Sequence, residues 1–147
     1  MLIYLDANLF VEALEGMNAL SEACWRLLES GDQGRNSLFT SELSLAEVLV
    51  KPLERDEATL AQRYLDLIQS RAGFLVAPVD RSILVFAAHI RKDALARDRS
   101  VKLPDAIHLA TAAQNCCEVI VSGDKRLEPA QPCRRIPLAL DEIEALL

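Results

Sequence analysis

Short apolar runs alternate with longer segments of helical periodicity along this chain, and this alternation limits the fold more than any other feature of the sequence. We predict strands at Met1–Leu5, Ser37–Thr40, Phe74–Val79, Glu118–Ser122 and Ile136–Leu138. Because one or more helical segments separate most of these strands, they are expected to be joined by crossovers and to lie parallel. The sequence therefore predicts an α/β fold, in which a small parallel sheet is flanked by helices on both faces.

Glycine and proline mark the expected ends of the helices. Gly16 and Gly31 close the first two helices, Pro52 stops the third, and Pro104 opens the sixth. We predict helices over residues 8–15, 19–30, 43–50, 57–71, 81–98, 104–115 and 141–146. Since no repeat or linker interrupts this order, the 147 residues are expected to form a single domain, residues 1–147.

The composition is that of a globular protein with a sizeable core. Hydrophobic residues make up 51% of the chain and aromatic residues 5%, and this excludes a disordered or low-complexity chain. The first apolar run ends at Asp6, which is too short for a signal peptide, and no run reaches the ~20 residues of a membrane span. Cys24, Cys116, Cys117 and Cys133 lack the spacing of a zinc site, and Cys116 and Cys117 are expected to be buried. We expect a soluble cytoplasmic protein with no membrane contact.

The charge is uneven along the chain. The net charge is −6, and residues 1–60 carry 4 basic and 11 acidic side chains, whereas residues 61–147 carry 12 basic and 11 acidic. A field of this sign repels a polyanion, so coating of nucleic acid without sequence preference is disfavoured. Chemistry on a nucleic acid would need a bound cation and local basic residues in the second half of the chain.

Four acidic residues end predicted strands or begin predicted helices. Asp6 and Asp124 follow the first and fourth strands, Glu47 lies in the first turns of the third helix, and Asp105 follows Pro104. Ligands of parallel sheets bind beyond the carboxyl ends of the strands, and there these four side chains are expected to converge.

Three of these acids also have an ordinary structural explanation. Glu47 completes a capping box with Ser44, Asp105 complements a helix dipole, and Asp124 suits a turn. Asp6 is different, because it interrupts an apolar run and is costly to bury unless something binds it.

A cluster of four carboxylates favours a bound cation. Like charges ~4 Å apart repel by ~4 kcal/mol at an effective dielectric constant of ~20, so either their pKa values rise or a cation binds. Carboxylate ligands select Mg²⁺ or Mn²⁺, and such an ion activates water for phosphodiester hydrolysis. The motifs of phosphate-binding loops, dinucleotide folds and serine hydrolases are absent. His108 shares a helix face with Asp105, and a structural or rim position is its expected role.

Four segments in this order resemble the PIN domain family, most closely the VapC-type toxins of bacterial type II toxin–antitoxin systems. They are Leu5–Leu9, Ser44–Val48, Leu103–Ala112 and Val121–Asp124, and the resemblance runs from Met1 to about Leu138. It implies a Rossmann-like fold, a Mg²⁺- or Mn²⁺-dependent endoribonuclease, a homodimer and inhibition by a cognate antitoxin.

The resemblance also implies roles for individual residues. Asp6, Glu47 and Asp105 match the principal metal-binding acids, and Asp124 matches the fourth. Two positions depart from the family pattern: Ala7 stands where Thr or Ser is common, and Ser122-Gly123-Asp124 stands where Thr-Asn-Asp is usual. Both departures keep all four carboxylates.

Further residues are expected to support the site. Ser122 keeps the hydroxyl of the usual motif, and Asn8 either binds a carboxylate or water or caps a helix. Basic residues flank the acids and are expected to contact RNA phosphates, with a solvated helix face as the alternative; they are Arg91, Lys92, Arg97, Arg99, Lys102, Lys125 and Arg126.

The apolar residues of two helices allow two interpretations. The helix that carries Trp25, with Leu20, Leu27 and Leu28, and the helix at 57–71 would form an apolar groove for an antitoxin helix, unless these residues pack in the core. An antitoxin would then insert a basic side chain among the acids. Two alternatives to a toxin stay open: a PIN-type RNA-processing nuclease outside a toxin pair, and an inactive binding module.

Overall fold

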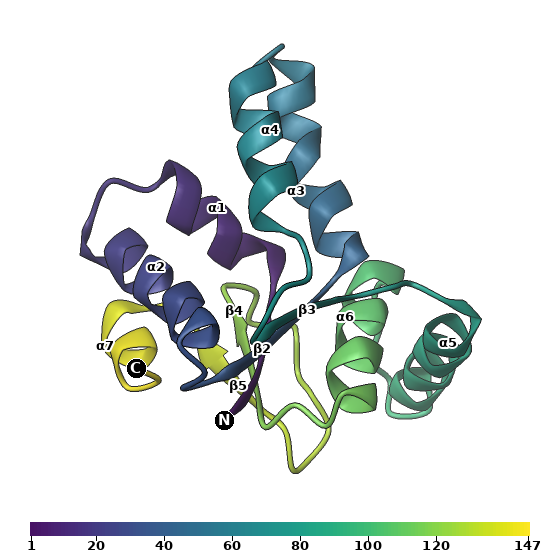
Figure 1. The fold of residues 1–147 in the computed structure, drawn as a ribbon. Coiled ribbons are helices and arrows are strands. Elements are labelled where there is room, and N and C mark those ends of the chain that lie inside the picture. The colour runs from purple at the N-terminus through teal and green to yellow at the C-terminus, as the bar shows by residue number, and fades with distance from the viewer.

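The computed structural model describes all 147 residues and has five strands in one parallel sheet (Figure 1). The strands are β1 (Leu2–Leu5), β2 (Ser37–Ser41), β3 (Phe74–Ala77), β4 (Val119–Ser122) and β5 (Arg134–Pro137), in the order β3-β2-β1-β4-β5. The chain first winds outward from β1 to β3 and then returns to the other side of β1 with β4. The gap between the ends of β1 and β4 is therefore the point at which the winding reverses, where ligands of such sheets bind.

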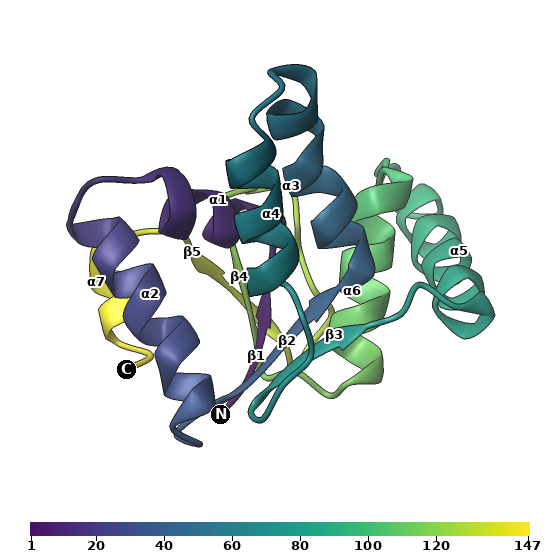
Figure 2. The same cartoon turned by 45° about the horizontal axis from the view of Figure 1, so that its top comes forward.

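Seven helices cover both faces of the sheet, as predicted. They are α1 (Ala7–Glu15), α2 (Ala19–Asp32), α3 (Glu42–Glu54), α4 (Ala58–Leu67), α5 (Arg81–Leu95), α6 (Leu103–Gln114) and α7 (Leu140–Glu144). In Figures 1 and 2, α1, α2 and α7 lie to one side of the sheet, α5 and α6 lie to the other, and α3 and α4 project together as an arm. None of these helices has both the length and the apolar character to cross a membrane.

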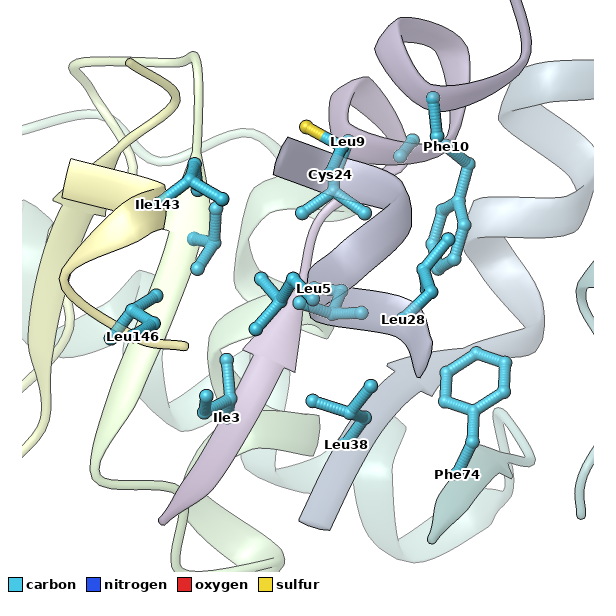
Figure 3. Close-up of a cluster of buried hydrophobic side chains, with 14 of the residues drawn as sticks. Ile3, Leu5, Leu9, Phe10, Cys24, Leu28, Leu38, Phe74, Ile143 and Leu146 are labelled. Atoms are coloured by element: carbon cyan, nitrogen blue, oxygen red, sulfur yellow. The ribbon is translucent and has the colours of Figure 1, made fainter. Parts of the chain in front are cut away.

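The alternation of side chains along β1 and β4 divides the core into two layers. Val119 and Val121 of β4 belong to the larger layer. Ile3 and Leu5 of β1 face the same layer, which is packed by α1, α2 and α7 (Figure 3). Its side chains include Leu9, Phe10, Cys24, Leu28, Leu38, Phe74, Ile143 and Leu146. Tyr4 and Ile120 point the opposite way, toward Leu109 of α6. The pleat therefore places Tyr4 under α6, on the side that carries the motif around Asp105.

The boundaries of α3 differ from the prediction at both ends. Ser41 caps the helix through its hydroxyl and Leu43 N–H (3.1 Å), so the predicted capping box of Ser44 and Glu47 does not form. Ser44 instead shares a buried hydrogen bond with Thr40 (2.8 Å). Pro52 does not stop the helix, which runs on to Glu54, because Pro52 is buried where α3 packs against α4. Tertiary contact outweighs the one hydrogen bond that proline removes.

Smaller differences occur elsewhere along the chain. The helices predicted over 57–71 and 81–98 end earlier, at Leu67 and Leu95, and the last strand lies at Arg134–Pro137 rather than at residues 136–138. Cys117 is buried as predicted, but Cys116 is exposed; it lies in the turn that leaves α6 and has a positive φ of 53°. No disulfide links the four cysteines.

Two glycines allow the end of α2 to approach the start of β3. Gly73 has a φ of +71°, and a Cβ atom there would lie 2.0 Å from the carbonyl oxygen of Gly31. Gly31 lies inside α2 rather than after it, and a Cβ atom at this position would lie 2.8 Å from the Leu38 side chain. This close approach fixes how α2 lies over the sheet.

Candidate metal centre

An open pocket of about 670 Å³ lies beyond the carboxyl ends of β1 and β4, and all four predicted acids line it. We call it the acid pocket. Its lining comes from β1–α1, α3, α6 and the turn after β4, and consists of Asp6, Ala7, Asn8, Val11, Glu15, Glu47, Val48, Val50, Lys51, Arg55, Asp105, His108, Asp124 and Leu127. The convergence expected from the sequence is therefore present in the structure.

Asp6 is the most firmly held of the acids. It is only 7% exposed, and its Oδ1 accepts a hydrogen bond from Ala7 N–H (2.7 Å), which makes it the cap of α1. Its Oδ2 accepts hydrogen bonds from Asn8 Nδ2 (3.2 Å) and Ser122 Oγ (2.6 Å). The Asn8 side chain thus binds a carboxylate and does not cap the helix. Three donors leave the charge of Asp6 stabilised and its orientation fixed.

A buried histidine holds Glu47. His108 is 1% exposed, its Nε2 lies 2.9 Å from Glu47 Oε2, and its Nδ1 lies 2.7 Å from the Tyr4 hydroxyl. Burial first, and then the charge of Asp6, raise the pKa of Tyr4 well above its usual value, so the hydroxyl keeps its proton. In the neutral imidazole, Tyr4 therefore donates to Nδ1, and the Nε2–H group donates to Glu47.

The charge state of His108 reflects the acids around it. Burial alone lowers the pKa of this imidazole, but the hydrogen bond to Glu47 and the charges of Asp6, Glu47 and Asp105 outweigh burial, and the net pKa is raised. Asp6 Oδ1 lies 3.7 Å from Nε2. The sequence predicts a rim or structural position for His108. Its ring is buried, as a structural position requires, and it also lines the acid pocket.

Asp105 lies in the first turn of α6 and is partly buried. Partial burial and the charge of Asp124 raise the pKa of its carboxyl group, and Arg126, His108 and Lys102 act in the opposite direction. Its carboxylate takes no part in the hydrogen bonds that hold Asp6 and Glu47. Asp105 is thus the acid of the pocket that most needs a positive partner.

Asp124 already has such a partner. Its carboxylate accepts hydrogen bonds from Arg126 Nη2 (2.8 Å), Nε (3.1 Å) and the backbone N–H (2.9 Å). These bonds hold the pKa of Asp124 at about 2, well below its usual value. Ser122 Oγ accepts a bond from Asp124 N–H (3.0 Å), so one hydroxyl links Asp124 to Asp6. Asp124 lines the pocket but is tied to a guanidinium group.

The donor atoms fit a hard divalent cation. Asp6, Glu47 and His108 each offer an atom within 4.8 Å of the others, while both ring nitrogens of His108 are already engaged by Tyr4 and Glu47. The remaining donors are carboxylate oxygens, and Asp105 adds a third from the same pocket. Oxygen-only donors match Mg²⁺ or Mn²⁺ rather than zinc or copper.

The predicted basic residues are spread over different surroundings. Arg126 contacts Asp124, and Lys102 is close enough to Asp105 and Asp124 to lower their pKa values. Arg91 donates to the Val101 carbonyl (3.1 Å). The others have different surroundings: Lys92 pairs with Asp93 (3.2 Å), Arg99 pairs with Glu128 (2.7 Å), Arg97 lines another pocket, and Lys125, next to Asp124 in the chain, is exposed.

Sequence reasoning missed two basic side chains of the acid pocket. Lys51 and Arg55 of the α3 region line it. The spacing of these residues in the sequence indicates their position, because Lys51 and Arg55 follow Glu47 by four and eight residues and so lie on the same helix face. For Tyr4, no such signal exists, because only the β1–β4 pairing brings it beneath His108.

Comparison with known proteins decides the family. The family model of the PIN domain matches residues 3–130. The chain belongs to the PIN domain family. No curated protein matches its sequence.

Solved structures share the fold of this PIN domain. VapBC2 from Rickettsia felis, bound to a promoter DNA fragment, has a TM-score of 0.72 at 17% identity and covers 93% of this chain and 98% of that one. FitAB bound to the IR36 DNA fragment has a TM-score of 0.70 at 20% identity, with coverages of 92% and 94%. VapC20 from Mycobacterium tuberculosis, a sarcin–ricin loop cleaving toxin, has a TM-score of 0.65 at 18% identity, with coverages of 85% and 92%. The likeness spans nearly the whole chain and concerns the fold.

Proposed function

We propose that this PIN domain is a Mg²⁺- or Mn²⁺-dependent endoribonuclease. One observation carries the proposal: the carboxylates of Asp6, Glu47, Asp105 and Asp124 line a single open pocket at the reversal point of a parallel sheet. A bound divalent ion would lower the pKa of a water molecule and offset the charge that builds on a phosphodiester during hydrolysis.

The residues at the acid pocket have different parts in this proposal. Asp6, Glu47 and Asp105 hold the ion, and Asp124 assists. Ser122 and Asn8 fix Asp6, since both donate to its Oδ2. Tyr4 and His108 hold Glu47 in place, so that the ion meets a carboxylate whose orientation is already set.

Local positive charge supports a nucleic-acid substrate despite the overall charge of −6. Lys51 and Arg55 line the acid pocket, and Arg126 binds Asp124, which also lines it. A phosphodiester strand bound in the pocket would have these cations next to its phosphates. Arg91, Lys92, Arg97, Arg99, Lys102 and Lys125 remain proposed contacts for the strand outside the pocket.

Cleavage of a mixed structured RNA pool in Mn²⁺, Mg²⁺ or EDTA tests the activity. Loss of a residue that only orients a metal ligand lowers metal affinity or activity about 10–100-fold. Asp105→Asn removes a proposed ligand itself, so we expect the cleavage rate to fall at least about 100-fold. Asp141→Asn, an exposed carboxylate on α7, is the matched control and should cleave normally. Calorimetric titration with Mn²⁺ adds a second readout, since Asp105→Asn should also weaken binding of the ion. Cleavage that persists in EDTA, or in folded Asp105→Asn, would refute the proposed activity.

We further propose that the protein is the toxin of a toxin–antitoxin pair, acts as a homodimer in the cytoplasm and is inhibited by its antitoxin. The fold neighbours include VapBC2 and a toxin–antitoxin complex from Klebsiella pneumoniae, and the four cysteines are unpaired. An antitoxin would place a basic side chain among the acids, where it replaces the charge of the ion. Expression should arrest growth, and co-expression of the small neighbouring open reading frame should relieve it. Growth without arrest, with intact RNA cleavage, would favour a processing nuclease.

Two observations favour an inactive binding module as the second candidate. Gly123 replaces the asparagine that is usual before the fourth acid, and Asp124 is tied to Arg126. A binding module would retain RNA in EDTA without cleaving it in any metal. The cleavage measurement, together with filter binding of RNA in EDTA, therefore separates the two candidates.

A further inference from the structure

A second pocket, which we call the flanking pocket, lies beside the acid pocket and has a volume of about 250 Å³. Helices α5 and α6 and the segment after β4 enclose it. Its lining consists of Phe86, Ile90, Asp93, Ala94, Arg97, Arg99, Val101, Leu109, Ala113, Arg126, Glu128, Pro129 and Ala130. None of the four acids belongs to it, and the proposed hydrolysis leaves it without a role.

A single ridge separates the two pockets. Arg126 lines the flanking pocket while its guanidinium group binds Asp124, and the next residue, Leu127, lines the acid pocket. The same division occurs on α6, where His108 faces the acids and Leu109 faces the flanking pocket. A ligand that spans the ridge at Arg126 therefore reaches both pockets.

The lining of the flanking pocket combines apolar side chains with three arginines and with the acids Asp93 and Glu128. Phe86, which is 38% exposed, and the aliphatic side chains of Ile90 and Leu109 supply the apolar part. The arginines are Arg97, Arg99 and Arg126. Arg99 is paired with Glu128 and Arg126 with Asp124, whereas Arg97 forms no ion pair.

We propose that the flanking pocket binds the nucleobase of the nucleotide next to the phosphate held at the acid pocket. This inference rests on the proposed nuclease function and adds a subsite to it. Pockets for drug-sized ligands have volumes of ~300–1,000 Å³, and the flanking pocket lies just below this range. Its size therefore suits a single nucleobase. An aromatic face and apolar walls accept the flat surface of a base, and the arginines meet its phosphates.

The charges of the flanking pocket favour a nucleotide over an apolar peptide side chain. An apolar anchor that covers the pocket would take the guanidinium group of Arg97, which has no ion-pair partner, out of water without supplying an acceptor. A nucleotide brings anionic oxygens together with its base, so the groups that become buried are also paired. Exchange of Asp124 for a phosphate oxygen at Arg126 would also release that carboxylate toward the acid pocket.

Methyl NMR of the full chain in EDTA tests the pocket directly. The probes are AMP, GMP, CMP and UMP, with each nucleoside and inorganic phosphate as separate arms. We expect nucleotides and nucleosides to shift the methyl signals of Ile90, Leu109 and Val101, and phosphate alone to leave them unchanged. Ala94→Trp fills the pocket from α5 and should weaken binding at least about tenfold, because it removes the stacking site.

Matched variants keep the result interpretable. Ala88→Trp places the same side chain on the exposed surface of α5 outside the pocket, and should bind as the wild type does. Ala113→Trp fills the pocket from α6, should lose binding too, and stands in if Ala94→Trp fails to fold. Shifts confined to methyl groups of the acid pocket, such as Val48 and Val50, or equal binding by the filled and control variants, would overturn the proposal. These readouts need neither metal nor cleavage, so they remain decisive if the nuclease activity itself is disproved.

Discussion

The hydroxyl of Tyr4 selects the tautomer of His108, and through it the position of Glu47. Tyr4→Phe removes the donor to a buried Nδ1 atom, which at such sites costs about 1–3 kcal/mol of stability. The ring is then free to adopt the other tautomer and turn from Glu47, so we expect weaker Mn²⁺ binding in a folded protein. Calorimetry with Mn²⁺ and the imidazole ¹⁵N shifts in alkaline buffer measure both effects. An unchanged Nε2–H tautomer in Tyr4→Phe would contradict this role of Tyr4.

Arg126 sets the acid titration of Asp124. The pKa of Asp124 is about 2, whereas a free aspartate titrates near ~3.9. A carboxyl whose pKa is lowered by folding adds stability above ~pH 4, and this contribution is lost as the pH falls toward 2. Arg126→Ala should return the pKa toward the free value and flatten the pH dependence of stability over that range. Carboxyl ¹³C titration would show it, and the prediction is wrong if the Asp124 midpoint stays near 2 in the variant.

The four cysteines should differ sharply in reactivity. Burial raises the pKa values of Cys24 and Cys117 to about 12, so almost no thiolate exists at these positions at neutral pH. Cys116 is exposed in a turn, and Cys133 is buried with a raised pKa. Native protein should therefore react rapidly with one equivalent of a thiol reagent, and with four after unfolding. Mass spectrometry should place the first label on Cys116. A second rapid equivalent would argue against the burial of the other thiols.

Among the elements, the contact between α2 and β3 depends on glycine. Gly73→Ala requires a left-handed backbone from alanine, which costs about 1–2 kcal/mol, and also places Cβ 2.0 Å from the Gly31 carbonyl oxygen. Gly34 has the same φ of +71°, but a Cβ atom added there would meet no other atom within 4 Å. Gly34→Ala should therefore lose only the stability that the left-handed backbone of alanine costs. Urea denaturation of both variants separates strain from collision. Equal loss of stability in the two variants would show that the collision relaxes at little cost.

The predicted elements agree with the structure where local sequence determines it and differ where packing does. The strands at β1, β3 and β4 and the helix α6 are visible from apolar runs and from Pro104, because burial and backbone restriction act within a few residues. The same local reasoning predicts a stop at Pro52, but the contact of α3 with α4 carries the helix past it. A single sequence does not reveal which helix will pack against another.

At the scale of the whole molecule, the sheet order makes the site predictable only in part. The convergence of the four acids follows from one rule about the carboxyl ends of parallel strands, and it holds. The pairing of Asp124 with Arg126 and the chain from Tyr4 through His108 to Glu47 do not follow from that rule. They depend on side-chain directions that appear only when β1 and β4 lie side by side. Sequence reasoning therefore located the acid pocket but not the groups that orient its acids.

The sheet order also determines when the acid pocket can exist during synthesis. Asp6 and Glu47 emerge early from the ribosome, whereas Asp105 and Asp124 lie in the last third of the chain. β1 waits unpaired on one side until β4 has been made, because these two strands are neighbours in space and distant in sequence. A nascent chain that has not yet reached β4 therefore lacks both the strand that neighbours β1 and the carboxylate of Asp124, so the acid pocket is complete only after these residues have been made.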